Sequence, residues 1–139
     1  MAQESDLAWN LATEVLARII ADGGPAWQVL GVDRAEEKAP PATDPTGVHH
    51  LRVTLGDGSD DEQRVAVYFT AGVPLSDAIV ATANQIQDHV IEATHGAALP
   101  RCPAHQHPLQ ATLVDGEPRW VCPPDASHHS EAILSASAV

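Results

Sequence analysis

Two short segments that each begin with Cys-Pro constrain the fold of this 139-residue chain more than any other feature of its sequence. The first segment is Cys102-Pro103-Ala104-His105, and the second is Cys122-Pro123-Pro124-Asp125. The fourth residue of each segment carries another group that can bind a metal ion. Residues 110–121 lie between the segments and are typical of two short strands about an Asp-Gly turn. Such a hairpin brings its two ends together, so the pattern predicts one metal site built from both segments.

The ligand types in these segments favour zinc, which proteins hold in a tetrahedron of cysteine, histidine and, less often, acidic side chains. We predict Cys102, His105, Cys122 and Asp125 as the ligands, in a layout that is typical of a zinc ribbon. Because aspartate is the least common of these ligands, the fourth position stays open between Asp125 and three nearby histidines, His107, His128 and His129. The alternatives to a metal are a disulfide between the two cysteines, which a reducing compartment disfavours, and two free thiols.

The charge of the chain limits the partners it can bind. Nineteen acidic residues against seven basic ones give a net charge of −12, and the segments 1–47, 48–99 and 100–139 are each negative. Nucleic-acid binding needs lysine and arginine contacts to phosphate, so we expect none, whereas a protein with a basic surface is a suitable partner. No stretch approaches the roughly 20 apolar residues of a membrane span, and the first residues lack the basic start of a signal peptide. We therefore expect a cytoplasmic protein without membrane contact.

Hydrophobic periodicity predicts two helices and three strands before the cysteines. Residues 5–22 and 76–95 read as amphipathic helices, because apolar residues recur every three or four positions, and Gly96 is the expected stop of the second helix. Residues 27–32, 50–55 and 64–69 read as strands. The acidic turn 57–62 lacks the glycine and the glutamate of a calcium-binding EF-hand loop, so we interpret it as a solvated turn.

These elements predict an α+β fold with a helix, a three-stranded antiparallel sheet, a second helix and a C-terminal zinc-ribbon-like β-hairpin. We place an α+β core in 1–99, with a mobile loop over 33–47, and the zinc-ribbon-like hairpin and a short tail in 100–139. Within the tail, Ala132-Ile133-Leu134 is expected to form a last helical turn.

The segment Cys102-Pro103-Ala104-His105-Gln106-His107-Pro108-Leu109, followed by Trp120-Val121-Cys122-Pro123, resembles small actinobacterial proteins of unknown function with a C-P-x-H-x-H-P-L and a later W-x-C-P. The single lysine and the alanine content also fit a GC-rich genome of that kind. The order of elements is similar to the secretion-chaperone-like fold, whose acidic and often dimeric members hold client proteins. This second similarity implies a protein-binding role.

From these observations we expect a small, acidic, non-catalytic zinc-binding interaction or adaptor protein with a protein partner, able to form a homodimer. The expected contact surfaces are the helix 76–95 and the outer face of the strands, which carries His50, Arg52, Arg64 and Tyr68. One alternative is a chaperone or immunity-type protein that binds a basic partner. The other is a small zinc-dependent hydrolase, in which three protein ligands leave one position open and Asp125 serves as the base. No signature of a zinc deaminase or a zinc peptidase occurs, and we predict no catalytic residue.

Overall fold

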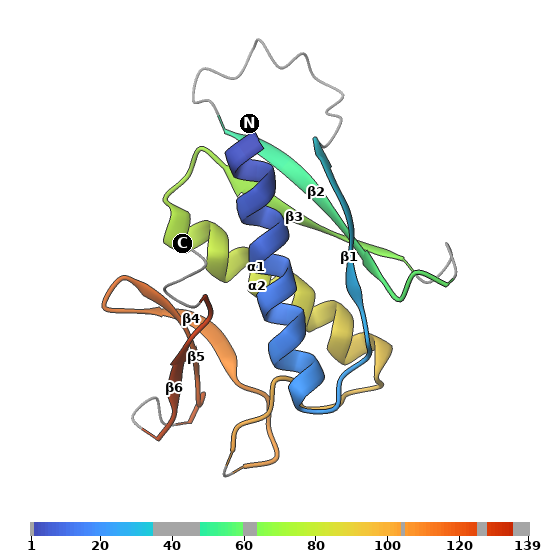
Figure 1. Ribbon diagram of the computed structural model, residues 1–139. Coiled ribbons are helices and arrows are strands. Elements are labelled where there is room, and N and C mark those ends of the chain that lie inside the picture. Colours follow the sequence, from blue (N-terminus) through green and yellow to red (C-terminus); the bar gives the residue numbers. More distant parts are fainter. Residues whose placement is uncertain (1, 35–47, 60–63, 104, 125–127, 135–139) are drawn as a thin grey trace.

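The computed structural model describes residues 2–34, 48–59, 64–103, 105–124 and 128–134 of the chain (Figure 1). These residues form two α-helices and two three-stranded antiparallel sheets, so the predicted α+β class is confirmed. In chain order the elements are α1 (Ala2–Ala21), β1 (Gln28–Arg34), β2 (His49–Gly56), β3 (Val65–Ala71), α2 (Leu75–Ala93), β4 (Gln110–Val114), β5 (Glu117–Val121) and β6 (Ser130–Ala132). Within the described ranges, neither helix is both long and apolar enough to cross a membrane.

Helix α1 follows the apolar pattern of its sequence and ends in a glycine turn. Leu11, Val15 and Ile19 are fully buried on its inner face. After the last turn, Gly23 takes a φ of 94°, and the N–H groups of Gly23 and Gly24 donate to the carbonyls of Ile20 and Ile19 at 2.9 and 3.0 Å. This pair of bonds is a Schellman cap, in which glycine adopts the left-handed conformation without a steric penalty. The helix begins at Ala2, three residues before the predicted start.

The first sheet has the strand order β1-β2-β3 and buries one face against the helices. Leu51, Val53 and Leu55 alternate inward along β2, as the sequence predicted. Strand β1 extends to Arg34, two residues past the predicted end, so the predicted loop over 33–47 begins too early. The extension pairs Asp33 with Arg52 on β2, and Arg52 Nη2 lies 2.6 Å from Asp33 Oδ2. The rest of that loop, 35–47, and residues 60–62 of the acidic turn lie outside the described residues.

Helix α2 lies beside the edge strand β3 and ends close to the predicted stop. The Gln85 side chain accepts a hydrogen bond from the Tyr68 N–H and donates one to the Tyr68 carbonyl, both at 2.8 Å. After the helix, His95 and Gly96 both have positive φ, at 59° and 98°. Their N–H groups donate to the carbonyls of Glu92 and Ile91, which closes the last turn as a second Schellman cap.

The second sheet has the order β4-β5-β6, where the sequence predicted only a hairpin. Asp115 and Gly116 both have positive φ, as the tight turn of a two-residue hairpin requires, and Val114 pairs with Glu117 across it. The predicted helical turn at 132–134 is wrong, because Ala132 belongs to β6, which pairs with β5, and Ile133 and Leu134 are buried behind it.

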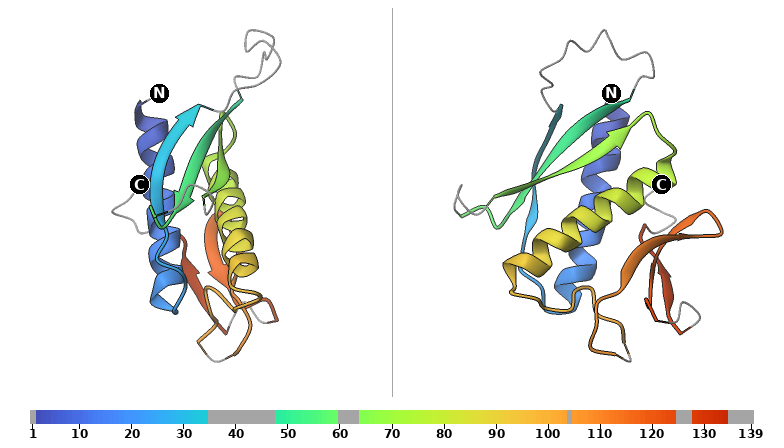
Figure 2. Two further views of the ribbon diagram at one scale, coloured as in Figure 1. Left: turned by 90° about the vertical axis from the view of Figure 1, so that its right-hand side faces the viewer. Right: turned by 180° about the vertical axis from the view of Figure 1, so that it is seen from behind.

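Helices α1 and α2 connect the two sheets into one core. The second sheet lies below the first in both views of Figure 2. Helix α2 contacts β3 in the first sheet and β4 and β5 in the second. Buried residues on both sides of residue 99, among them Val53, Ile86 and Trp120, belong to one hydrophobic cluster. The division of the chain at residue 99 stays a prediction, but the two parts share this core.

Candidate metal centre

A closed loop between α2 and β4 brings a cysteine and a histidine to the same place. The Leu109 N–H donates to the Pro100 carbonyl at 2.7 Å, and the Cys102 N–H donates to the His107 carbonyl at 3.1 Å. These bonds fold residues 100–109 back on themselves like a small hairpin. From α2, the buried Gln87 amide donates to the carbonyls of Leu99 and Leu109 at 3.2 and 2.6 Å. The base of the loop is therefore fixed to the helix, and His107 returns beside Cys102.

Four potential ligand atoms gather where this loop meets the end of β5. One ligand atom from each of Cys102, His105, His107 and Cys122 lies within 4.8 Å of every other. Both cysteines are buried thiols, His107 is half-buried and His105 is exposed. The centre thus has its sulfur atoms inside the protein and an imidazole at the surface.

Three of the six distances among these atoms are close to those of a tetrahedron about one metal ion. With metal–sulfur and metal–nitrogen bonds of about 2.3 and 2.0 Å, sulfur and nitrogen ligands of a tetrahedral ion are about 3.5 Å apart. Cys102 Sγ lies 3.4 Å from His105 Nδ1, and Cys122 Sγ lies 3.7 Å from the same nitrogen. Cys122 Sγ also lies 3.8 Å from His107 Nε2. All three separations agree with shared coordination to within a few tenths of an ångström.

The two histidines would bind through different ring nitrogens. His105 directs Nδ1 at the sulfur atoms, whereas His107 directs Nε2 at Cys122. The other nitrogen of His107, Nδ1, lies 3.2 Å from the Pro108 carbonyl, to which it can donate a hydrogen bond. A ligand histidine in metal proteins usually donates its second ring N–H in this way, and the bond fixes both the tautomer and the ring orientation.

Three of the four predicted ligands lie in this group, and His107 joins them from the predicted alternatives. Asp125 lies outside the described residues, so its assignment stays a prediction. His128 lies beside the group, with its ring centroid 4.7 Å from that of His105. His129 faces away into a different contact, since its Nε2 lies 2.7 Å from Glu131 Oε1. Neither of these two histidines contributes to the four-atom group among the described residues.

A carboxylate and a guanidinium lie behind the centre and were not predicted from the sequence. Glu131 of β6 accepts hydrogen bonds from Arg18 of α1 and from His129. Burial of the Glu131 carboxyl raises its pKa, but the hydrogen bonds from Arg18 and His129 outweigh burial and hold the pKa below its ordinary value. Glu131 is therefore a stable carboxylate between a helix and the second sheet. No sequence spacing indicates this contact, because Arg18 and Glu131 are 113 residues apart.

The chain was compared with protein-family models, with curated proteins and with solved structures. None of the three comparisons finds a match.

Proposed function

We propose that the protein binds one structural zinc ion through Cys102, His105, His107 and Cys122, and acts as a small acidic interaction protein. The observation that carries the metal assignment is the gathering of four ligand atoms within 4.8 Å of one another, from two parts of the chain. Two cysteines and two histidines are one of the usual ligand sets of a structural zinc site.

The ligand set selects zinc over the hard divalent cations. Two thiolates and two imidazoles in a tetrahedron suit Zn²⁺, whereas magnesium and calcium require oxygen ligands. Four protein ligands fill a tetrahedral shell, so no position is left for a reactive water molecule. This argues for a structural ion and against the hydrolase alternative, which needs an open position.

The ion would add a link between two segments that the β4–β5 pairing and the core already bring near each other. Cys102, His105 and His107 belong to the loop after α2, whereas Cys122 directly follows β5. Because such a site is rarely formed in an unfolded chain, the free energy of metal binding stabilises the folded arrangement. Zinc would thus strengthen the connection between the loop after α2 and the end of β5.

Metal content and ligand variants test the zinc site. Protein purified without chelators should contain about one zinc per chain, and cobalt substitution should give a tetrahedral spectrum with thiolate charge-transfer bands. His107→Ala should weaken metal binding, while His128→Ala, which removes the neighbouring histidine, should not. If Asp125→Ala weakens binding and His107→Ala does not, the fourth ligand is Asp125. Native protein without metal and with a Cys102 to Cys122 disulfide would refute the zinc site.

The interaction role is supported by charge and by the exposed side chains. The chain carries a net charge of −12, and Trp9, Tyr68 and Leu75 are large apolar side chains that are about two-fifths exposed. Acidic surface with apolar side chains among it suits a basic protein partner, and a second copy of the chain is the other proposed partner.

Isolation of the protein from its own cells tests this role. A basic protein should co-purify with the wild type and dissociate from it at moderate salt. Less of this partner should co-purify with a Tyr68→Ala, Leu75→Ala double variant. Metal-dependent hydrolysis by the purified protein would contradict the interaction role. A clean 14.7 kDa monomer by light scattering would exclude the homodimer.

A further inference from the structure

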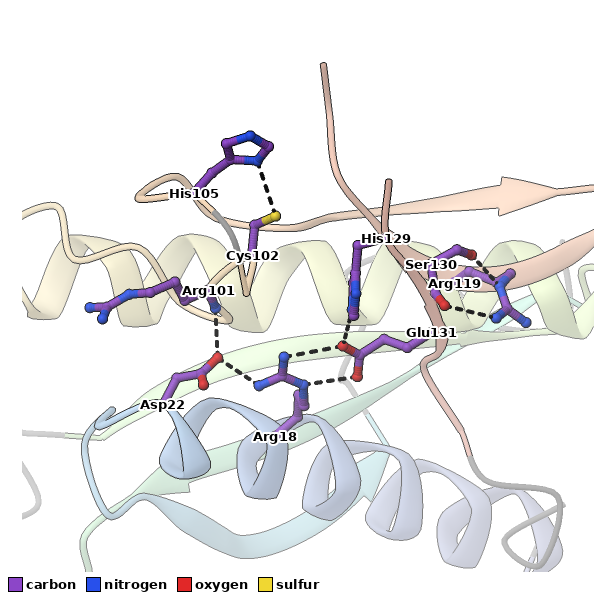
Figure 3. A network of polar contacts seen from close by, with 9 residues as sticks. All are labelled: Arg18, Asp22, Arg101, Cys102, His105, Arg119, His129, Ser130 and Glu131. Carbon is purple, nitrogen blue, oxygen red and sulfur yellow. Dashed lines mark hydrogen bonds and ion pairs between the residues drawn. The ribbon is translucent and has the colours of Figure 1, made fainter. Parts of the chain in front are cut away.

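We infer that Arg18 of α1 is a positioning residue that holds both metal-binding segments in the arrangement that a zinc ion needs. This inference rests on the proposed zinc site, and it goes further by assigning control of that site to a side chain that binds no metal. It follows from one network of hydrogen bonds, which Figure 3 shows between α1, the loop after α2 and β6.

One branch of this network reaches the segment that contains Cys102. Arg18 Nη1 lies 2.6 Å from Asp22 Oδ2, one turn further along α1. The same carboxylate oxygen accepts the backbone N–H of Arg101 at 2.6 Å. Arg101 immediately precedes Cys102, so the position of this cysteine depends on the carboxylate that Arg18 holds in place.

The second branch reaches the segment that contains Cys122. Arg18 Nε and Nη2 donate to the two oxygens of Glu131 at 2.8 and 3.1 Å, a bidentate pair. Glu131 Oε1 also accepts a hydrogen bond from His129 Nε2 at 2.7 Å. The backbone carbonyl of His129 accepts the N–H of Cys122 at 3.1 Å.

One guanidinium therefore links the backbone of Arg101, next to Cys102, and the backbone of Cys122 to the same helix. The side chains of Arg18, Asp22 and Glu131 are only 24%, 24% and 29% exposed, so water screens their contacts less than it would at an open surface. The planar guanidinium can bond to Glu131 with two nitrogens and to Asp22 with a third, a geometry that a lysine ammonium does not reproduce. With both cysteines held in this way, their sulfur atoms stay within 4.8 Å without help from the ion.

Zinc affinity measured by competition with a chromophoric chelator tests the inference. Arg18→Gln should weaken zinc binding by about 10-fold, the lower end of the loss when a residue that hydrogen-bonds a metal ligand is removed, because Arg18 acts through Asp22 and Glu131. Arg18→Lys keeps the charge and should recover only part of the affinity. Arg52→Gln is the matched control, because it removes an arginine–carboxylate pair in the first sheet and should leave the affinity unchanged. Equal affinities for Arg18→Gln and Arg52→Gln would overturn the inference.

Disulfide formation in metal-free protein gives a second readout that does not depend on zinc. Diamide accepts two electrons and two protons from a pair of neighbouring thiols, which become a disulfide. Wild type and Arg52→Gln should form the Cys102 to Cys122 bond quickly, and Arg18→Gln should form it more slowly at equal helix content by circular dichroism. Equal rates in all three would also overturn the inference. If wild type binds no zinc but Arg18→Gln still slows the oxidation, the proposed zinc function fails and the positioning role stands.

Discussion

His95 occupies a backbone conformation that its side chain disfavours. Its φ is 59°, in the left-handed region, directly after α2. Glycine adopts this conformation without the Cβ clash, so His95→Gly should raise the free energy of unfolding by about 0.5–1 kcal/mol. Ala93→Gly is the control: this residue is in the helix, and the same glycine should cost about 1 kcal/mol there. Urea denaturation measures both, and a loss of stability in His95→Gly would show that the imidazole makes a compensating contact.

Gln87 is a buried amide whose two hydrogen bonds fix the base of the metal-binding loop. Gln87→Leu keeps the size but removes the donor to the Leu99 and Leu109 carbonyls, so stability should fall by about 2–3 kcal/mol. Gln85→Leu on the same helix should cost less than about 1 kcal/mol, because its contacts with Tyr68 are exposed to water. Equal costs for the two substitutions in thermal unfolding would contradict this account.

At the scale of single residues, the spacing of the two Cys-Pro segments predicted three of the four residues that the structure brings together. It favoured Asp125 as the fourth ligand, which lies outside the described residues, and the structure places His107, one of the predicted alternatives, beside the sulfur atoms. His107 arrives through backbone hydrogen bonds inside the loop, which spacing alone does not reveal. Its signal in the sequence was the Cys-x-x-His-x-His pattern, in which both histidines lie within one short loop.

Among the elements, long periodic segments were predictable and β6 was not. The apolar stripes of α1 and α2 and the alternation in β2 and β3 follow directly from burial on one face. Strand β6 has only three residues, Ser130-Glu131-Ala132, and no hydrophobic alternation. It is stabilised by pairing with β5 and by the contact of Glu131 with Arg18. Both interactions depend on distant residues, so no local pattern indicates the strand.

The contact of Glu131 with Arg18 predicts a pH dependence of stability. Because the pKa of Glu131 is lower in the folded protein than its ordinary value of 4.5, its carboxylate stabilises the fold above that value. The contribution disappears as the pH falls through the lowered pKa of the folded state. In metal-free protein, Glu131→Gln should therefore be about 1–2 kcal/mol less stable than wild type at pH 7, with the difference shrinking below about pH 4. A difference that stays constant between these pH values would show that packing, not charge, is responsible.

Removal of the proposed zinc ion should loosen the second sheet before the first. Cys122→Ser, or a chelator on wild type, takes away the link between the loop after α2 and the end of β5. Amide hydrogen exchange should then rise first in residues 100–124, while α1, α2 and the first sheet stay protected. Simultaneous loss of protection in residues 48–95 would show that the two sheets unfold as one unit.

Over the whole molecule, charge gives a prediction about nucleic acid. Arg18, Arg52 and Arg119 lie within 4 Å of carboxylates, so these cations are already paired. With a net charge of −12 as well, the zinc-loaded protein should show no binding to duplex or single-stranded DNA at micromolar concentration and about 0.1 M salt. Fluorescence anisotropy with labelled oligonucleotides measures this, and a salt-sensitive increase would point to an RNA- or DNA-binding role.

The sequence also predicted the α+β class of the whole molecule, but not how the two sheets share a core. Charge and hydrophobic content can be read directly from the sequence, without knowledge of the structure. By contrast, the packing of α2 against both sheets depends on which of its faces meets which strand. Periodicity identifies the buried face of a helix but not its neighbours.

The amide of Gln85 has a consequence for strand addition at the edge of the first sheet. An edge strand exposes N–H and carbonyl groups that can pair with a strand of another chain, which is a common route to aggregation. At the β3 edge, Gln85 supplies Tyr68 with the donor and the acceptor that an incoming strand would offer. At the opposite edge, β1 has an irregular register between Val29 and Gly31 and ends in the charged pair Asp33-Arg34. Both edges of the first sheet therefore carry features that disfavour growth by strand addition.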